Sequence, residues 1–178
     1  MRKMNQGYHE IKEHGKREFP FNIYPCSIPV DFTHVALHWH EEMEIIAVKK
    51  GNGRITVDTV SYPVSEGDIL AVFPGQLHAI SCGSGERMEY ENIIFRISML
   101  MGDNGDGCTV HFLSPLQEGQ AKKPVLIQKG QTDYEVFGNV IRELDKFSQQ
   151  QGNGYQLAVK GQLFLFLYYA YGRGILFA

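Results

Sequence analysis

Apolar and polar residues alternate along the first two-thirds of the chain, as they do in half-buried β-strands. The alternation is clear where Val35, Leu37 and Trp39 fall on one face of an extended segment. Further short strands are predicted over residues 44–50, 54–57, 61–64, 69–73, 77–82 and 87–97. Gly, Pro, Asn and Asp residues separate these segments, and many short strands with turns between them are typical of a β-barrel or sandwich.

Three local features refine the predicted barrel. Residues 19–25 are extended and punctuated by proline, which suits an edge strand or a cover over the barrel mouth. Residues 50–53 are rich in Gly and Asn, which tolerate positive φ, so they predict a hairpin turn between two strands. Asp58 and Thr59 predict another tight turn.

The pattern changes to helical spacing beyond position 128. Thr132 followed by Glu135 resembles a capping box at the start of a helix. That helix presents an apolar stripe with a period of three to four residues, formed by Phe137, Val140, Ile141, Leu144 and Phe147. Residues 152–154, Gly-Asn-Gly in sequence, end it, and a second helix is predicted from about Tyr155 to Gly172.

The second predicted helix carries apolar side chains around nearly its whole circumference. A helix packed on a barrel needs one apolar stripe, so the excess indicates a two-fold contact with a second copy. The residues predicted to form this dimer interface are Leu163, Phe164, Phe166, Leu167 and Tyr171. The alternative is a helix buried in the core of a single chain.

Composition limits the class of protein. A length of 178 residues with 43% hydrophobic residues fits one domain, and a net charge of −3 without a basic patch argues against a free-standing nucleic-acid binder. Three widely spaced cysteines without a CxxC motif indicate a reducing compartment. No signal peptide or membrane-length apolar run is apparent, so a cytoplasmic protein with no membrane partner is expected, with residues 1–18 as a flexible leader.

The chemistry of the sequence concentrates in residues 38–44. His38 and His40 have the same strand parity, and Glu44 returns to that face either directly or across a short turn. Two imidazoles and a carboxylate form a borderline-hard site suited to a divalent ion such as Zn, Ni, Fe or Mn. The neighbouring Glu41 and Glu42 are interpreted as solvated turn residues.

Two motifs give this stretch a family resemblance. The spacing His38-x-His40-x3-Glu44-x6-Gly51, followed by Gly67-x7-Gly75-x2-His78, resembles the two motifs of the cupin fold. The resemblance implies a double-stranded β-helix (jelly-roll) barrel. It also implies that His38, His40, Glu44 and His78 bind one metal ion inside that barrel. The alternative is that these four residues are pocket-lining groups that hold no metal.

The order of motifs along residues 30–172 further resembles the N-terminal domain of AraC-type transcription regulators. It includes the paired histidines, a Pro-Gly turn before His78, a Phe-Leu-x-Pro-Leu stretch over 112–116 and two final helices. The resemblance implies an effector-binding cupin barrel over 19–128 and a two-helix dimerisation segment over 132–172. It also implies that DNA is bound only through a C-terminal helix-turn-helix domain, which residues 1–178 lack.

Three functions are therefore weighed for the chain. The favoured one is a non-enzymatic domain that senses a small molecule, dimerises and signals to a DNA-binding domain. The alternatives are a small metal-dependent enzyme, such as a dioxygenase or isomerase, and an inert dimerisation or storage module. The residues considered for contact with an acidic or hydroxylated effector are Arg54, Tyr62, Tyr90 and Arg96.

Overall fold

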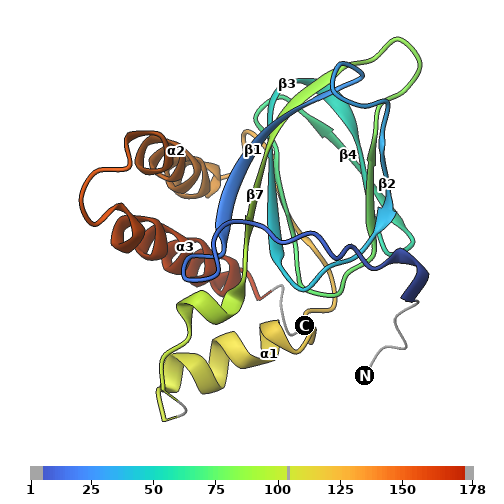
Figure 1. The fold of residues 1–178 in the computed structure, drawn as a ribbon. Helices are drawn as coiled ribbons and strands as arrows, with labels where there is room; N and C mark the ends of the chain where they lie inside the picture. Colours follow the sequence, from blue (N-terminus) through green and yellow to red (C-terminus); the bar gives the residue numbers. More distant parts are fainter. Residues whose placement is uncertain (1–5, 104, 175–178) are drawn as a thin grey trace.

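The computed structural model describes residues 6–103 and 105–174, which form an antiparallel β-barrel with helices on one side (Figure 1). Its strands are β1 (Phe21–Ile28), β2 (Val35–His38), β3 (Met43–Val57), β4 (Val60–Ser65), β5 (Ile69–Val72), β6 (His78–Ser81), β7 (Met88–Phe95) and β8 (Val125–Ile127). One sheet has the order β1-β7-β3-β5-β8, and the other joins β4, β3, β6 and β2. The predicted barrel is confirmed, and β1 is the expected edge strand.

Strand β3 belongs to both sheets. Its first half pairs with β7 and β5, and its second half, from Asn52, pairs with β4 and β6. A register shift between Val48 and Lys50 marks the place where it bends. Gly51 follows with φ +76, and a Cβ there would lie 2.0 Å from the Arg87 carbonyl oxygen. A glycine is therefore required at this close approach.

This geometry corrects the hairpin predicted over residues 50–53. The chain does not reverse there, and one strand continues to Val57. Positive φ is compatible with either a hairpin turn or a bulge, so glycine alone does not distinguish them. The reversal comes instead at Asp58 (φ 54), at the second predicted turn.

Two apolar cores lie on opposite faces of the first sheet. Alternate residues of β3, such as Ile46 and Val48, join a cluster between the two sheets, inside the barrel. The intervening residues, such as Ile45 and Ala47, join a larger cluster with the helices outside the barrel. Burial of both faces explains why this part of β3 is almost continuously apolar.

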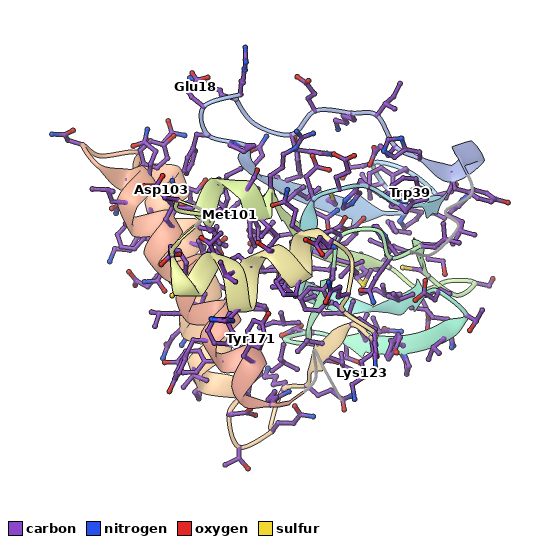
Figure 2. The ribbon with its side chains drawn as sticks, turned by 90° about the horizontal axis from the view of Figure 1, so that it is seen from below. Glu18, Trp39, Met101, Asp103, Lys123 and Tyr171 are labelled. Carbon is purple, nitrogen blue, oxygen red and sulfur yellow. The ribbon has the colours of Figure 1, made fainter. Side chains whose placement is uncertain are left out.

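The helical elements are η2 (Ile97–Leu100), η3 (Thr109–Leu113), α1 (Ser114–Gln117), α2 (Tyr134–Gln150) and α3 (Tyr155–Gly172), together with a short η1 (Gln6–Tyr8). Helices α2 and α3 stack against the sheet that contains β1 and β7, as Figure 1 shows. The η3–α1 segment lies below the barrel and α3 in Figure 1, so it lies in front of them in Figure 2, which is seen from below. Among the described residues, no helix is long and apolar enough to cross a membrane.

The two long helices confirm the predicted pattern, with one correction at a terminus. Phe137, Val140, Ile141 and Leu144 are buried in the outer core, as their spacing predicted. The N-cap of α2 is Asp133 rather than Thr132, and no side chain caps the helix. Arg173, at the end of α3, instead binds the Asp133 carboxylate and fixes the two helices together.

The predicted dimer interface is only partly available to a partner. Leu163, Phe166 and Leu167 are buried by the chain's own core, because the inner face of α3 packs against α2 and the barrel. Tyr171 is half-buried and donates a hydrogen bond to the Phe112 carbonyl. Phe164 is exposed, and so are three further apolar residues of α3 that the prediction did not include: Leu157, Leu165 and Tyr168.

The N-terminal segment is also a correction. Residues 1–5 of the predicted leader lie outside the described residues, but residues 7–18 pack along one end of the barrel. Trp39 donates a backbone hydrogen bond to Tyr8, and Glu10 donates one back to Trp39. The His9 ring stacks on Trp39, with centroids 4.1 Å apart. The polar composition of this segment suggested a solvated leader, but both its backbone and its side chains contact the barrel.

Lys49 joins α2 to the barrel through two carboxylates. Its Nζ lies 2.6 Å from Glu91 Oε2 on β7 and 2.8 Å from Asp145 Oδ2 on α2. Burial and the neighbouring Asp145 carboxylate raise the pKa of Glu91, although Lys49 opposes the shift. The ammonium therefore compensates two carboxylates that would otherwise repel each other.

We expect Lys49→Met to lower the free energy of unfolding by about 1 kcal/mol, since it leaves two carboxylates facing each other in a partly screened site. The neighbouring Lys50→Met is the matched control. Lys50 pairs with Glu89 at 3.5 Å on the exposed surface, so the change should be close to zero. Urea denaturation of both variants measures the difference, and equal effects would contradict this role for Lys49.

Candidate metal centre

Three strands and one loop bring the four predicted metal ligands together at one end of the barrel. His38 is the last residue of β2, and His78 is the first of β6, directly opposite it in the register. Glu44 lies near the start of β3 on the inner face, and His40 lies in the loop between β2 and β3. The backbone N–H of Gly75 donates to the His40 carbonyl, which holds this loop against the turn between β5 and β6.

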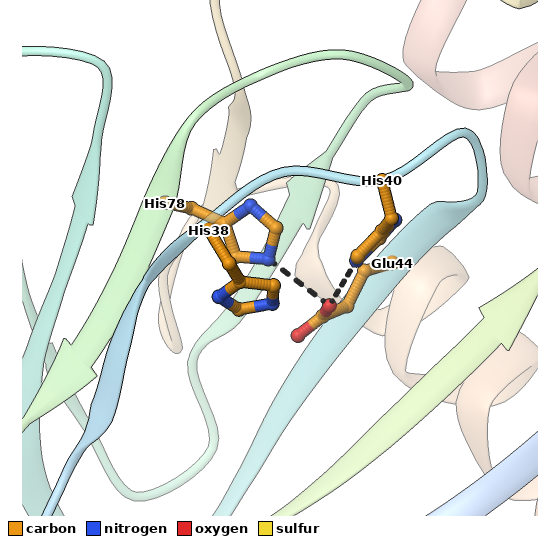
Figure 3. Close-up of side chains that lie close together, drawn as sticks. All are labelled: His38, His40, Glu44 and His78. Atoms are coloured by element: carbon orange, nitrogen blue, oxygen red, sulfur yellow. Dashed lines mark hydrogen bonds and ion pairs between the residues drawn. The ribbon is translucent and has the colours of Figure 1, made fainter. Parts of the chain in front are cut away.

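The four side chains converge on one point (Figure 3). Each offers a ligand atom, and these atoms all lie within 4.8 Å of one another. Oε2 of Glu44 lies 3.0 Å from His40 Nε2 and 3.2 Å from His78 Nε2. His40, Glu44 and His78 are almost fully buried, whereas His38 is partly exposed at the rim.

The backbone fixes the orientation of all three imidazole rings. Nδ1 of His38 lies 2.8 Å from the Ala36 carbonyl oxygen, and Nδ1 of His78 lies 2.9 Å from that of Gln76. Nδ1 of His40 is 3.1 Å from the carbonyl of Glu42. A carbonyl oxygen accepts but never donates, so each Nδ1 carries the hydrogen, and in a neutral ring Nε2 has a free lone pair. This tautomer is the one that binds a metal through Nε2.

The electrostatics of the cluster call for a positive charge. Burial raises the pKa of the Glu44 carboxyl, but the charges and hydrogen bonds of His78 and His40 outweigh it and hold the pKa well below its usual value. Burial lowers the pKa of His40, but Glu44 and then Glu42 raise it overall. Burial and the neighbouring His78 lower the pKa of His38. A buried carboxylate facing Nε2 lone pairs requires protons or a metal ion between them.

Glu42 is a correction to the sequence prediction. It was expected to be solvated, yet it is buried, and Arg96 Nε donates to its Oε1 at 2.8 Å. Its other oxygen, Oε2, lies 3.7 Å from His40 Nδ1. Glu42 therefore contacts His40 in two ways: its backbone carbonyl accepts from Nδ1, and its carboxylate places a buried negative charge beside the ring. Glu41 is exposed, as predicted.

A cavity of about 380 Å³ opens beside His40, between the barrel rim and the end of α1. Its volume falls in the range of small-molecule sites. Its lining includes Trp39, His40, Glu41, Pro74, Arg96 and Gln117. Of the four candidate ligands, His40 is the one that borders this cavity.

The four residues considered for effector contact do not line one site. Arg96 lines the cavity beside His40. Arg54 lines a separate hollow of about 180 Å³ at the far end of β3, and Tyr62 packs at the edge of the inner core. Tyr90 is fully buried within that core, where burial raises its pKa far above the usual value. The barrel interior is filled by apolar side chains, which is why Tyr62 and Tyr90 serve packing.

Sequence reasoning missed two residues near the centre. His14 was interpreted as part of the leader, but it is buried, its ring lies 6.2 Å from that of His40, and its Nδ1 is 3.2 Å from the Tyr24 hydroxyl. Glu10 lies beside it, with Oε2 3.6 Å from His38 Nε2. Their spacing of four residues resembles an ordinary helical pair, so no sequence signal linked them to the motif.

Comparison with known proteins adds a family to this geometry. Residues 29–167 match the family model of the AraC-like ligand binding domain. A curated relative, the uncharacterized HTH-type transcriptional regulator YdeC of Bacillus subtilis (strain 168), is 28% identical over 88 residues. That match covers 49% of this chain and 30% of the relative, so the chain spans less than a third of that protein.

Solved structures similar to the chain include two cupin proteins. A cupin protein from Bacteroides fragilis is 25% identical over 47% of this chain and 69% of its own, with a TM-score of 0.36. A Cupin 2 conserved barrel domain protein from Salinispora arenicola is 21% identical over 50% of this chain and 74% of its own, with a TM-score of 0.41.

We expect the chelator-treated protein to bind one Zn²⁺ or Mn²⁺ ion, and His40→Ala to weaken binding about 100-fold, because it removes a buried ligand. His34→Ala is the control, since His34 is exposed and contacts Thr33. Isothermal titration of the three proteins gives affinity and stoichiometry. Equal affinity for wild type and His40→Ala would contradict a metal centre built on this residue.

Proposed function

Because the chain belongs to the family of AraC-like ligand-binding domains, we propose that it is the small-molecule-sensing and dimerisation unit of an AraC-type transcription regulator. In this proposal DNA is contacted by a helix-turn-helix domain that is not among residues 1–178. The effector binds at a metal centre formed by His38, His40, Glu44 and His78. The observation that carries this is the convergence of three Nε2-directed imidazoles on one buried carboxylate.

The proposed ion is a divalent metal such as Zn, Ni, Fe or Mn. Imidazole nitrogen and carboxylate oxygen suit this group of metals, and the protein supplies four such ligands. Five- and six-coordinate ions keep one or two positions open beyond these four. An effector with oxygen donors fits an open position on a metal of this kind.

The proposed effector is a small acidic or hydroxylated molecule that enters the cavity beside His40. Arg96 borders this cavity, and its Nε is already held by Glu42. Its terminal nitrogens have no hydrogen-bond partner among the described residues, so they are available to a carboxylate. Gln117 and Ser98 add polar groups on the same wall.

The same position offers a route for the signal to the helices. The cavity is bounded on one side by the barrel rim and on the other by Gln117 at the end of α1. The preceding η3 is joined to α3 by the hydrogen bond from Tyr171 to the Phe112 carbonyl. An effector that bridges rim and α1 therefore stabilises one placement of α1 against α3, and this is the differential binding that allostery requires.

Dimerisation is assigned in this proposal to the outer face of α3. Leu157, Gly161, Leu165 and Tyr168 recur at intervals of three or four residues, Phe164 lies beside Leu165, and all five are exposed. A contiguous apolar stripe of this kind fits a two-fold contact with the same stripe of a second chain. The three cysteines are free thiols, which agrees with the cytoplasmic location expected of such a regulator.

A small metal-dependent enzyme is the second candidate. It is favoured by open metal positions beside a cavity of about 380 Å³. Among the described residues, the titratable groups lining that cavity, apart from His40, are Glu41, Arg96 and Glu118, and the Arg96 guanidinium is held by Glu42. The sensing function explains both the metal centre and the exposed apolar stripe of α3, which an enzyme would not require. For this reason it is preferred.

We expect the metal-loaded chain to gain a few degrees in melting temperature from one or more compounds in a panel of small hydroxy acids and dicarboxylates. Arg96→Gln should reduce this gain, whereas Arg142→Gln on the exposed side of α2 should not. A thermal-shift titration measures both. If no compound stabilises the loaded protein, the effector class is wrong, and conversion of a compound into product would favour the enzyme.

We expect wild type to be a dimer at micromolar concentration, and Tyr168→Glu combined with Leu165→Glu to be a folded monomer, because two charges in the stripe are desolvated on association. Val60→Glu, at an exposed apolar position on β4, is the control and should remain dimeric. Light scattering after size-exclusion chromatography measures the mass. A monomeric wild type, or a dimeric α3 variant, would overturn the assignment.

A further inference from the structure

Glu10 approaches the metal centre from outside the barrel. Its Oε2 lies 3.6 Å from His38 Nε2, and its side chain is 33% exposed. The residue precedes the part of the chain that matches the family model, which begins at residue 29. Glu10 therefore lies outside the histidine–glutamate motifs over residues 38–44 and 67–78.

The backbone holds Glu10 next to the ligands. Its N–H donates to the Trp39 carbonyl at 2.9 Å, and the Trp39 N–H donates to Tyr8 at 2.9 Å. Trp39 lies between His38 and His40 in the sequence. The two backbone hydrogen bonds to Trp39 therefore hold Glu10 next to these two candidate ligands. The His9 ring stacked on Trp39 stabilises the same register.

The distance between Glu10 and His38 is compatible with two ligands of one metal ion. Bonds of about 2.1 Å in a six-coordinate site place neighbouring ligand atoms about 3 Å apart and opposite ones about 4 Å apart. The separation of 3.6 Å between Glu10 Oε2 and His38 Nε2 lies between these limits. The Glu10 oxygen is not among the ligand atoms that lie within 4.8 Å of one another, so its partly exposed side chain has to rotate toward the other four residues to share their ion.

Charge balance also favours a second carboxylate. Three neutral imidazoles and one carboxylate leave a divalent ion with a net charge of about +1 in a largely buried site, which is costly. His38 is the histidine at the exposed rim, and its hydrogen-bonded Nδ1 leaves the Nε2 lone pair facing Glu10. A lone pair and a carboxylate oxygen repel unless a cation lies between them. Glu10 would neutralise the site from its open side.

We propose that Glu10 is a fifth protein ligand of the metal centre, supplied by the N-terminal segment. This inference rests on the proposed metal site and adds a consequence to it. Metal binding ties residues 8–14 to the barrel mouth and leaves one position of a six-coordinate ion for an effector.

The test compares Glu10→Gln with Glu13→Gln in the full chain. Both changes remove one carboxylate from the same segment, and Glu13 is exposed. Isothermal titration with Mn²⁺ and Zn²⁺ should show one ion in each protein, with affinity about tenfold weaker for Glu10→Gln and nearly unchanged for Glu13→Gln. Hydrogen exchange supplies the second measurement. Metal should slow exchange at the amides of Glu10 and Trp39 in wild type and in Glu13→Gln, and much less in Glu10→Gln.

The outcomes separate this inference from the proposed function. Wild-type affinity and metal-induced protection in Glu10→Gln would overturn the fifth ligand. If His40→Ala still loses the ion in that case, the four-ligand centre stands without Glu10. If wild type binds no metal, both the centre and the fifth ligand are wrong.

Discussion

The arrangement of one end of this barrel depends on the buried carboxylate of Glu44. Without compensation, a charge in that position would cost several kcal/mol. Three imidazoles surround it, from strands β2 and β6 and from the loop before β3. Each Nδ1 donates to a backbone carbonyl, so each Nε2 faces the carboxylate. The site is therefore organised for a cation before any ion arrives, and Glu42 with Arg96 supports it from behind.

Strand β3 connects this site to the rest of the molecule. Its first half carries Glu44 and forms the wall between the inner and outer cores, and its second half crosses into the other sheet at the bulge near Gly51. Lys49, beside that bulge, fixes α2 to the outer wall. A single continuous strand thus links the centre, the barrel and the helices that the proposed function uses.

The sequence predicted the parts of the structure that depend on local pattern. The alternation and the helical stripe depend on residues close in the chain, and the barrel, α2 and α3 followed from them. The convergence of the four ligands was implied by the resemblance to the cupin motifs, because His78 is distant from Glu44 in the chain. The predicted hairpin at residues 50–53 was wrong because a bulge and a turn both require a glycine with positive φ. Helix α2 begins one residue later than the capping pattern at Thr132 predicted, with Asp133 as its N-cap.

Contacts between distant segments were not predictable in this way. The pairing of Glu10 with Trp39 is made by the backbone and leaves no mark in side-chain pattern. Burial of Glu42 depends on Arg96, more than fifty residues away. For α3 the sequence indicated excess apolar surface, but only packing against α2 decides that Leu163 faces inward while Leu157 and Tyr168 face out.

The central claim is that a metal ion bridges Glu44 and the three histidines. Anomalous diffraction from crystals of the protein soaked in Zn²⁺, recorded above and below the zinc absorption edge, locates any bound ion directly. We expect one strong anomalous peak within bonding distance of Nε2 of His38, His40 and His78 and of a Glu44 oxygen. A peak found only at another site would contradict the metal centre. So would the absence of any peak, with the histidines hydrogen-bonded to Glu44 or to water instead.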